Sequence, residues 1–360
     1  MSRPFALVLT LLLAAAPAPA QDRDPGRLVV LLKSEAAAQV VDLADGATLA
    51  RIPTGVGPHE VLVLPGARRA VVANYGGRTP GATLTVLDLR RDRALRTVDL
   101  GEPARPHGLA VTPTTGELWV TAEERRSLLR LDPLDWVVRE EVALPHRLGH
   151  MVASDDDGRL YVAHLADGGV TRVRAEAGPP LADGRPVLHY VVERFVATGA
   201  GSEGLAWDPV HGLLWVTDRE ADDVVALDPE DLSVRHRLEA EGFPIRAAVT
   251  PDGARLLVSC ARAGVLRAYD LTGPAPEAAG TLDFGALARG DGADRLFGSA
   301  MGDSPTPIGI TLSGDGGRAY VSLAHADRVA EVAVSDLVVL RTFATGREPD
   351  GIAWYPTPRE

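Results

Sequence analysis

The chain has 360 residues, a formal net charge of −12 and a single cysteine, Cys260. The acidic balance excludes the basic surface that nucleic-acid recognition needs, so no nucleic-acid partner is expected. A lone cysteine excludes an intrachain disulfide, so stability must come from burial and strand pairing. A chain of this length exceeds one ordinary core unless the domain is a closed or repeated β architecture.

Residues 1–20 have the pattern of a secretory signal peptide. Arg3 supplies a positive charge, the segment 5–16 is apolar, and the small residues 18–20 predict a cleavage after Ala20. The apolar segment is shorter than the roughly 20 residues that a membrane-spanning helix needs, and no later segment approaches that length. We therefore expect an exported mature chain, 21–360, that is periplasmic or extracellular.

Three short alternating segments open the mature chain, at 27–32, 38–43 and 48–53, and each is predicted to be a strand. A repeat then begins, and its first residue recurs at seven anchor positions: Pro58, Pro106, Gly149, Ser202, Pro244, Pro307 and Pro349. An anchor opens a short apolar strand, which a Gly- or Asp-containing turn joins to a second strand. A third strand, often ending in Asp, and a more polar fourth strand complete the repeat.

Four short strands per repeat, with almost no helical periodicity, are typical of a β-propeller. Seven anchors predict an all-β fold of seven blades with four antiparallel strands each, in one domain over 21–360. The last anchor has only one strand, 350–355, before the chain ends, and the first three strands of the mature chain lack a fourth. The final blade is therefore predicted to be closed by both termini, which hides two strand edges.

The second strands carry the most specific signature. Residues 161–164 read YVAH and residues 215–218 read WVTD, and with the strand–turn pattern over 27–360 they resemble the YVTN-repeat propellers, which include YncE-like periplasmic proteins. The resemblance implies the seven-bladed fold. It implies no single activity, because propellers serve as enzymes, binding modules and scaffolds alike.

The residue after each anchor is predicted to enter the innermost strand of its blade, so these residues converge on the axis of the central channel. They are, in chain order, His59, His107, His150, Glu203, Ile245, Ile308 and Asp350. Five of them form one continuous arc of imidazoles and carboxylates, which suit zinc, copper, iron or manganese. The arc is therefore a candidate metal site. A metal-free pocket for a polar ligand and a plain wet lining are the alternatives.

Other polar residues of the same face are weaker candidates. Arg246 follows its anchor by two positions and would either hold an anion or a substrate carboxylate, or pair with Glu203 of the preceding blade. His325 is expected in a solvated loop. Three residues that end second strands are expected to be solvated or to cap turns: Asn74, His164 and Asp218.

Two long spacings mark insertions. Residues 284–306 join a fourth strand to the next anchor, which places them at the channel mouth. There, Phe297 and Met301 would belong either to a lid or to a solvated loop. Residues 175–186 join a third strand to a fourth and are expected on the far face, without a function.

The arc fits an exported binding protein that holds a metal ion or a small molecule at the axial channel. Such a protein would act alone or with another exported protein. The partners expected are therefore the small molecule or ion, and no membrane span is needed.

The second candidate function is a metal-assisted hydrolase of lactonase type. The stretches 203–204 and 350–351, an acidic residue followed by glycine, resemble the gluconolactonase propellers, which implies a divalent ion that activates water. This chain departs from that family because it offers histidines where the family has asparagine or carboxylate. Metal-independent lactonase propellers use histidine, arginine and glutamate, which His107, Arg246 and Glu203 match as catalytic candidates.

The third candidate function is that of a redox accessory protein with copper or haem. The arc resembles the histidines that the propellers of nitrous oxide reductases and haem-containing nitrite reductases present to copper or haem from the same face. The chain has no Cys-x-x-Cys-His haem attachment site.

Overall fold

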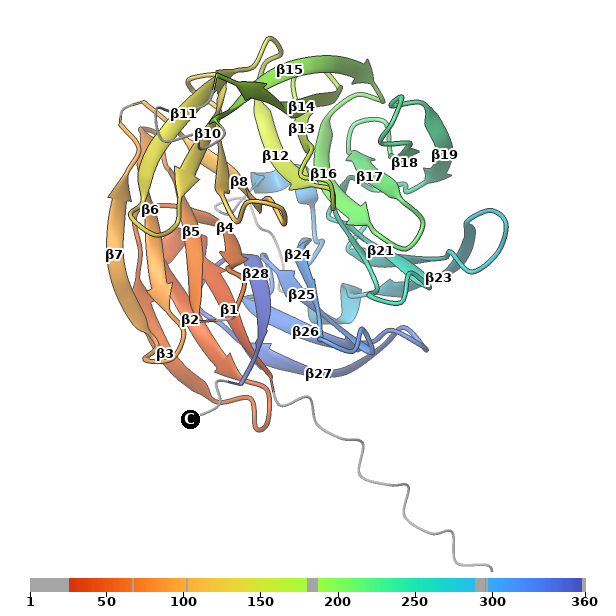
Figure 1. Cartoon of the computed structure of the whole chain (residues 1–360). Helices are drawn as coiled ribbons and strands as arrows, with labels where there is room; N and C mark the ends of the chain where they lie inside the picture. The colour runs from red at the N-terminus through yellow and green to blue at the C-terminus, as the bar shows by residue number, and fades with distance from the viewer. Residues whose placement is uncertain are drawn as a thin grey trace, which may run out of the picture.

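The computed structural model describes residues 26–66, 68–101, 103–179, 187–288, 295 and 297–357, so the expected signal peptide lies outside the described residues. Within them the strands form seven four-stranded antiparallel sheets arranged in a ring (Figure 1). The predicted all-β, seven-bladed β-propeller is confirmed. The helical segments described are three short 3-10 turns: η1 (Lys33–Glu35), η2 (Gly285–Leu287) and η3 (Gly298–Met301). In the described part of the chain, no helix is long and apolar enough to cross a membrane.

The first three blades follow the chain directly. Blade 1 consists of β4 (Pro58–Val63), β5 (Arg69–Gly76), β6 (Pro80–Asp88) and β7 (Arg93–Asp99). Blade 2 consists of β8 (Pro106–Val111), β9 (Leu118–Ala122), β10 (Ser127–Asp132) and β11 (Val137–Ala143). Blade 3 consists of β12 (Gly149–Ser154), β13 (Leu160–His164), β14 (Gly169–Gly178) and β15 (Val187–Ala197).

The next three blades repeat this order. Blade 4 consists of β16 (Ser202–Asp208), β17 (Leu213–Asp218), β18 (Asp223–Leu227) and β19 (Val234–Glu239). Blade 5 consists of β20 (Pro244–Val249), β21 (Arg255–Cys260), β22 (Val265–Asp270) and β23 (Glu277–Asp283). Blade 6 consists of β24 (Pro307–Leu312), β25 (Arg318–Leu323), β26 (Arg328–Ala333) and β27 (Val338–Ala344).

Blade 7 joins the two ends of the described chain. β28 (Pro349–Pro356) pairs antiparallel with β1 (Gly26–Leu32), which is followed by β2 (Ala37–Asp42) and β3 (Thr48–Pro53). Figure 1 shows the blue β28 beside the red β1. The predicted closure of the final blade by both termini is confirmed, and each of these two strands gives the other a partner for its backbone groups.

The core lies between neighbouring blades, because alternate residues of a strand face opposite sides of its sheet. In β9, Leu118 and Val120 pack in the cluster shared with blade 1, whereas Trp119 packs with Val152 and Leu160 of blade 3. The largest fully buried side chains include four aromatic residues of second strands: Trp119, Tyr161, Trp215 and Tyr320. Full burial of a large apolar side chain contributes about 1.5–3 kcal/mol, so each such residue helps to hold two blades together.

The seven first strands line the channel. β4, β8, β12, β16, β20, β24 and β28 contact one another in this order around the ring, and β28 contacts β4. In every blade the register of the first strand shifts just after the anchor. Such a bulge re-aims the side chains beside it, and it coincides with the residues that the sequence places at the axis.

Candidate functional site

A residue in the left-handed backbone region precedes every anchor. On the second strand of the same blade the anchor has a register partner, and the N–H of the residue after that partner donates to this carbonyl oxygen, at 2.9 to 3.3 Å. All seven have positive φ: Gly57, Arg105, Leu148, Gly201, Phe243, Thr306 and Glu348. This hydrogen bond joins the residue before the anchor to the residue after the anchor's partner, at the mouth of each blade.

Close approach of neighbouring blades explains the glycine that stands two residues after the anchor in four blades. A Cβ on Gly108 would lie 2.7 Å from the carbonyl oxygen of His150 in the next blade, which is closer than side-chain carbon atoms are found. The remaining three blades carry a side chain at this position: Glu60, Met151 and Arg246. Two of these three are charged, and both join the site described below.

The five polar residues predicted to converge form one series of contacts. Nδ1 of His59 lies 2.6 Å from Oδ2 of Asp350, and the ring centroids of His59 and His107 are 4.2 Å apart. The ring centroids of His107 and His150 are 3.5 Å apart. Nε2 of His150 lies 3.5 Å from Oε1 of Glu203. The structure therefore brings all five residues together in the order of their blades.

His107 is the central member of this arc and is fully buried. Neither of its ring nitrogens has a hydrogen-bond partner among the residues that the structure describes. Burial, followed by electrostatic interaction with His150, His59 and Arg246, holds the pKa of His107 well below its ordinary value. His107 is therefore a neutral imidazole with an available lone pair, which is the form that binds a metal ion.

His150 is in the opposite state. Its Nδ1 bonds to Glu123, whose other oxygen accepts the hydroxyl of Tyr75 at 2.9 Å. Burial alone would lower the pKa of His150, but Glu123 and Glu203 outweigh it and raise the pKa to about 9. His150 is thus an imidazolium between two carboxylates. The arc combines a neutral and a charged histidine in direct contact.

Asp350 supports the other end of the arc. Lys33 lies with its Nζ 3.0 Å from Oδ2 of Asp350, which is fully buried. Burial favours the neutral acid, but His59 and Lys33 hold the pKa of Asp350 below its ordinary value. A carboxylate held against Nδ1 fixes the ring of His59 and leaves Nε2 as the nitrogen free to bind a ligand.

Arg246 crosses the channel. Its Nη1 donates to Oε1 of Glu203 at 3.1 Å, and its Nη2 donates to Oε1 of Glu60 in blade 1. Arg219 donates to the other oxygen of Glu203 at 2.6 Å. Burial opposes ionisation of Glu203, but His150, Arg219 and Arg246 hold its pKa below the ordinary value. The pair of Arg246 and Glu203 that the sequence offered as one alternative is present.

Among the residues that the structure describes, two groups of side chains have ligand atoms close enough to hold one metal ion. One group is His59, Glu60 and His107, and the other is His107, Glu123 and His150. Within each group the ligand atoms lie within 4.8 Å of one another. Imidazole and carboxylate bind first-row transition metals, and three protein ligands leave a position for water or another molecule. These two groups are therefore the candidate metal sites at the mouth of the channel.

The residues that follow the anchors' partners on the second strands form a second set of mouth positions, which the sequence interpretation missed. They are Lys33, Tyr75, Glu123, Leu165, Arg219, Ala261 and Ala324. Four of the seven are polar or charged, and all four contact a member of the arc or its direct partner. Glu60 was also missed. The repeat itself held the signal, because these positions are as equivalent from blade to blade as the anchors are.

The polar residues that end second strands are structural. Asn74, His164 and Asp218 are buried rather than solvated. The Asn74 side chain accepts the N–H of Gly55 at 3.1 Å, and Asp218 accepts the hydroxyl of Thr198 at 2.9 Å. These bonds cap the loops that enter blades 1 and 4. The expectation that His325 is solvated is wrong, because only 2% of this residue is exposed.

The described part of the insertion 284–306 packs on the apolar side of the mouth. Phe297 packs against a buried apolar cluster, and two members of this cluster, Ile245 and Ile308, follow anchors. The cluster consists of Phe243, Ile245, Ala261, Met301, Ile308 and Ala324. Residues 289–294 and 296 lie outside the described residues. The polar arc therefore faces an apolar wall that the insertion covers in part, and its action as a lid stays a prediction.

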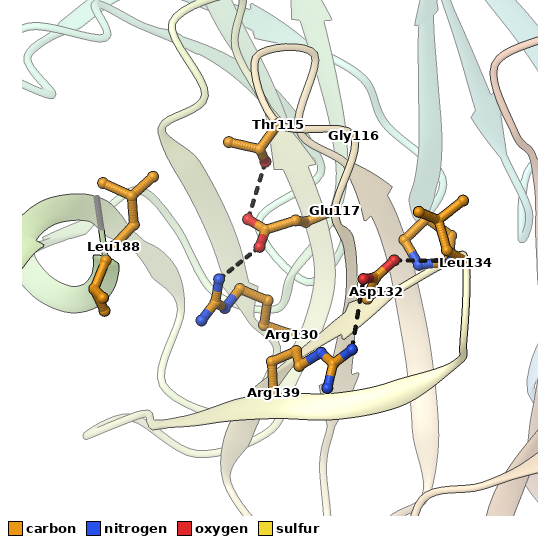
Figure 2. Close-up of a pocket in the computed structure, with 10 residues that line it drawn as sticks. Thr115, Gly116, Glu117, Arg130, Asp132, Leu134, Arg139 and Leu188 are labelled. Atoms are coloured by element: carbon orange, nitrogen blue, oxygen red, sulfur yellow. Dashed lines mark hydrogen bonds and ion pairs between the residues drawn. The ribbon is translucent and has the colours of Figure 1, made fainter. Parts of the chain in front are cut away.

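A pocket of about 740 Å³ lies between the turns of blade 2 and the first residues of β15 (Figure 2). Its lining includes Val187 and Leu188, which follow the second insertion, 175–186, in the chain. Residues 180–186 lie outside the described residues. Arg130 on its wall pairs with Glu117 at 2.5 Å and with Glu140 at 3.1 Å. These ion pairs join β10 to β11 and to the residue before β9, so we assign them to the stability of blade 2.

Comparison of the chain with protein-family models finds no match, and comparison with curated proteins finds none. Solved structures are similar in fold. A functionally unknown protein from Desulfotomaculum acetoxidans has a TM-score of 0.72 and 12% identity, over 91% of this chain and 98% of its own. A catalytically inactive histidine-to-alanine variant of virginiamycin B lyase from Staphylococcus aureus, with quinupristin, has a TM-score of 0.61 and 12% identity, over 91% and 92%. Hydrazine synthase from Kuenenia stuttgartiensis has a TM-score of 0.60 and 14% identity, over 90% and 100%. At these identities the likeness shows the fold alone.

Proposed function

We propose that this protein is an exported, YVTN-type propeller that binds a divalent transition metal ion at the mouth of its channel. The observation that carries the proposal is the buried His107, whose two ring nitrogens have no partner among the described residues. A buried polar group without a partner costs roughly 1–3 kcal/mol. A metal ion between His107 and its neighbours removes that cost.

The ligands proposed are His59, Glu60 and His107. In this group Asp350 already fixes the ring of His59 from behind, as carboxylates do for metal-binding histidines. In the other group both nitrogens of His150 face carboxylates, so neither nitrogen is available to a metal ion. In the first group only Glu60 has a competing partner, Arg246. The five-residue set predicted from the sequence thus narrows to two direct histidine ligands, with Asp350, His150 and Glu203 as supporting groups.

The metal is zinc, copper, iron or manganese in this proposal, because imidazole and carboxylate suit all four. Export follows from the signal-peptide pattern of residues 1–20 and places the protein in the periplasm or outside the cell. A small molecule at the open coordination position, or another exported protein at the mouth, would be its partner.

Elemental analysis of the mature chain, 21–360, tests the proposal after loading with zinc and removal of free ion. The wild type should hold about one metal ion per chain, and His107→Ala should hold none. His189→Ala is the matched control, because this histidine is exposed on β15, outside the arc. A folded wild type that stays metal-free after loading would overturn the proposal.

A metal-assisted hydrolase of lactonase type is the alternative function. The cationic side chains around the proposed metal ligands favour this function, because they can hold a substrate near a water activated by the metal. They are Lys33, Arg219 and Arg246. A panel of lactones with the loaded protein separates the two functions. Turnover that His107→Ala abolishes supports the enzyme. Absorption bands of copper or haem in the purified protein would instead support a redox accessory role.

A further inference from the structure

Glu60 and Arg246 meet across the channel from blades that are not neighbours in the ring. Glu60 lies on β4 of blade 1 and Arg246 on β20 of blade 5, whereas β4 contacts β28 and β8. The side chains of Arg246, Glu60 and Glu203 are 9%, 14% and 3% exposed. The guanidinium is therefore a buried charge whose two counterions come from opposite sides of the axis.

The same Glu60 belongs to the proposed metal ligands, and the two roles compete. Its Oε1 accepts from Nη2 of Arg246, while a metal ion between His59 and His107 would draw the carboxylate toward itself. A guanidinium and a metal ion also repel each other at this range. Because Glu60 would then share its negative charge between two cations, metal binding weakens the counterion on the Nη2 side of Arg246, in a buried place where a lone charge is costly.

The sum of the charges at the site also favours an anion once a metal ion is bound. Lys33, His150, Arg219 and Arg246 face four carboxylates: Glu60, Glu123, Glu203 and Asp350. With His59 neutral, as a histidine that binds a metal must be, these charges sum to zero when His150 is charged and to −1 when it is not. A divalent ion makes the total positive in either case. An anion bound beside the metal would offset this positive charge.

We propose that metal binding turns Arg246 into an anion receptor, so that the site takes up a small oxyanion beside the metal. The ligand class is a carboxylate or a phosphate, because the planar fork of arginine matches two oxygens of either group. The metal binds first and the oxyanion second. This inference rests on the proposed function, since it needs the metal at Glu60.

Calorimetric titration of acetate, and separately of inorganic phosphate, into metal-free and zinc-loaded mature protein tests the inference. We expect at least one of the two anions to bind the zinc-loaded form about tenfold or more tightly than the metal-free form. By linkage, the same anion must raise the affinity for zinc by the same factor. Tighter binding of acetate than of phosphate identifies a carboxylate ligand, and the reverse identifies a phosphate.

Two variants separate the parts of the mechanism. In Glu60→Gln the amide cannot neutralise Arg246, so the anion should bind without zinc while the affinity for zinc falls. In Arg246→Gln zinc should still bind, and the anion affinity should no longer depend on it. Circular dichroism checks that each variant folds. Arg130→Gln is the matched control, because Arg130 also pairs with two glutamates, away from the channel, and should leave both affinities unchanged.

The outcomes distinguish the inference from the function on which it rests. A folded wild type that binds no zinc overturns both. A wild type that binds zinc but shows equal anion affinities with and without it overturns the inference alone. Failure of Glu60→Gln to bind either anion in the absence of zinc also contradicts it.

Discussion

Thr121 of blade 2 holds His150 of blade 3. The hydroxyl of Thr121 accepts the N–H of Gly108 at 2.8 Å and donates to the carbonyl oxygen of His150 at 2.7 Å. The same link recurs in three other blades through a hydroxyl on the second strand: Thr217, Ser259 and Ser322. Each link fixes the backbone of a channel-mouth residue to the neighbouring blade.

Replacement of Thr121 by valine should therefore loosen His150. The variant keeps the shape of the side chain but leaves the N–H of Gly108 and the carbonyl oxygen of His150 unpaired, at a cost of about 1–3 kcal/mol. Urea denaturation should show a lower midpoint with an unchanged slope, and the imidazole NMR signals of His150 should shift. Thr121→Ser keeps the hydroxyl and should preserve both. Equal stability of the valine and serine variants would contradict the role of the link.

The sequence was sufficient to predict the blades and their closure, because both depend on local periodicity. Strands alternate with a period of two and turns recur, so the anchors predicted the number of blades. The single strand after the last anchor and the three strands before the first predicted the pairing of the termini. The convergence of His59, His107 and His150 followed from the same equivalence, since identical positions in a ring face one axis.

Contacts that cross the ring could not be predicted in this way. The pair of Glu60 and Arg246 joins blades 1 and 5, and neither strand contains any local sign of the other. The partners of the arc depend on side-chain length and burial rather than on position. Glu203, for example, is held by two arginines and an imidazolium and so serves as a counterion.

Gly57 should not tolerate a side chain. Its φ is +61°, and a Cβ would lie 2.2 Å from the carbonyl oxygen of Gly76, which is backbone and cannot move aside. We expect Gly57→Ala to destabilise the protein by about 2–4 kcal/mol and to displace His59. Gly66→Ala is the control, because Gly66 also has a positive φ but has open space around its Cβ. Gly66→Ala should lower the free energy of unfolding by only about 1 kcal/mol. Thermal melting of the two variants measures the difference, and a similar loss in both would contradict the steric cause.

Asp218 makes stability depend on pH. Burial, helped by the nearby carboxylate of Asp223, raises the pKa of Asp218 to about 6 in spite of the hydroxyl groups of Ser202 and Thr198. The folded protein thus holds a proton that the unfolded chain releases near pH 4. The contribution of Asp218 to stability is therefore most favourable below pH 4 and falls as the pH rises toward 6.

Replacement of Asp218 by asparagine should remove this dependence. Asp218→Asn should be more stable than the wild type above pH 6, by at most about 3 kcal/mol, and the gain should vanish below pH 4. Asn74 occupies the same position in blade 1, so Asn74→Asp should show the opposite change. Urea denaturation at pH 4, 5, 6 and 7 measures both. A gain for Asp218→Asn that is constant over this range would exclude the titration of Asp218 as its cause.

Two conservative variants at the ends of the arc should locate the metal. Asp350 orients His59, whereas Glu203 faces His150, so the two carboxylates support different proposed ligand groups. Loss of a carboxylate behind a ligating histidine lowers metal affinity about 10- to 100-fold. If the ion lies between His59, Glu60 and His107, Asp350→Asn should weaken zinc binding by that factor. Glu203→Gln should then change the zinc affinity by less than about threefold, because His150 takes no part in coordination. Competition with a chromophoric chelator measures both dissociation constants, and the reverse ranking would place the ion between His107, Glu123 and His150.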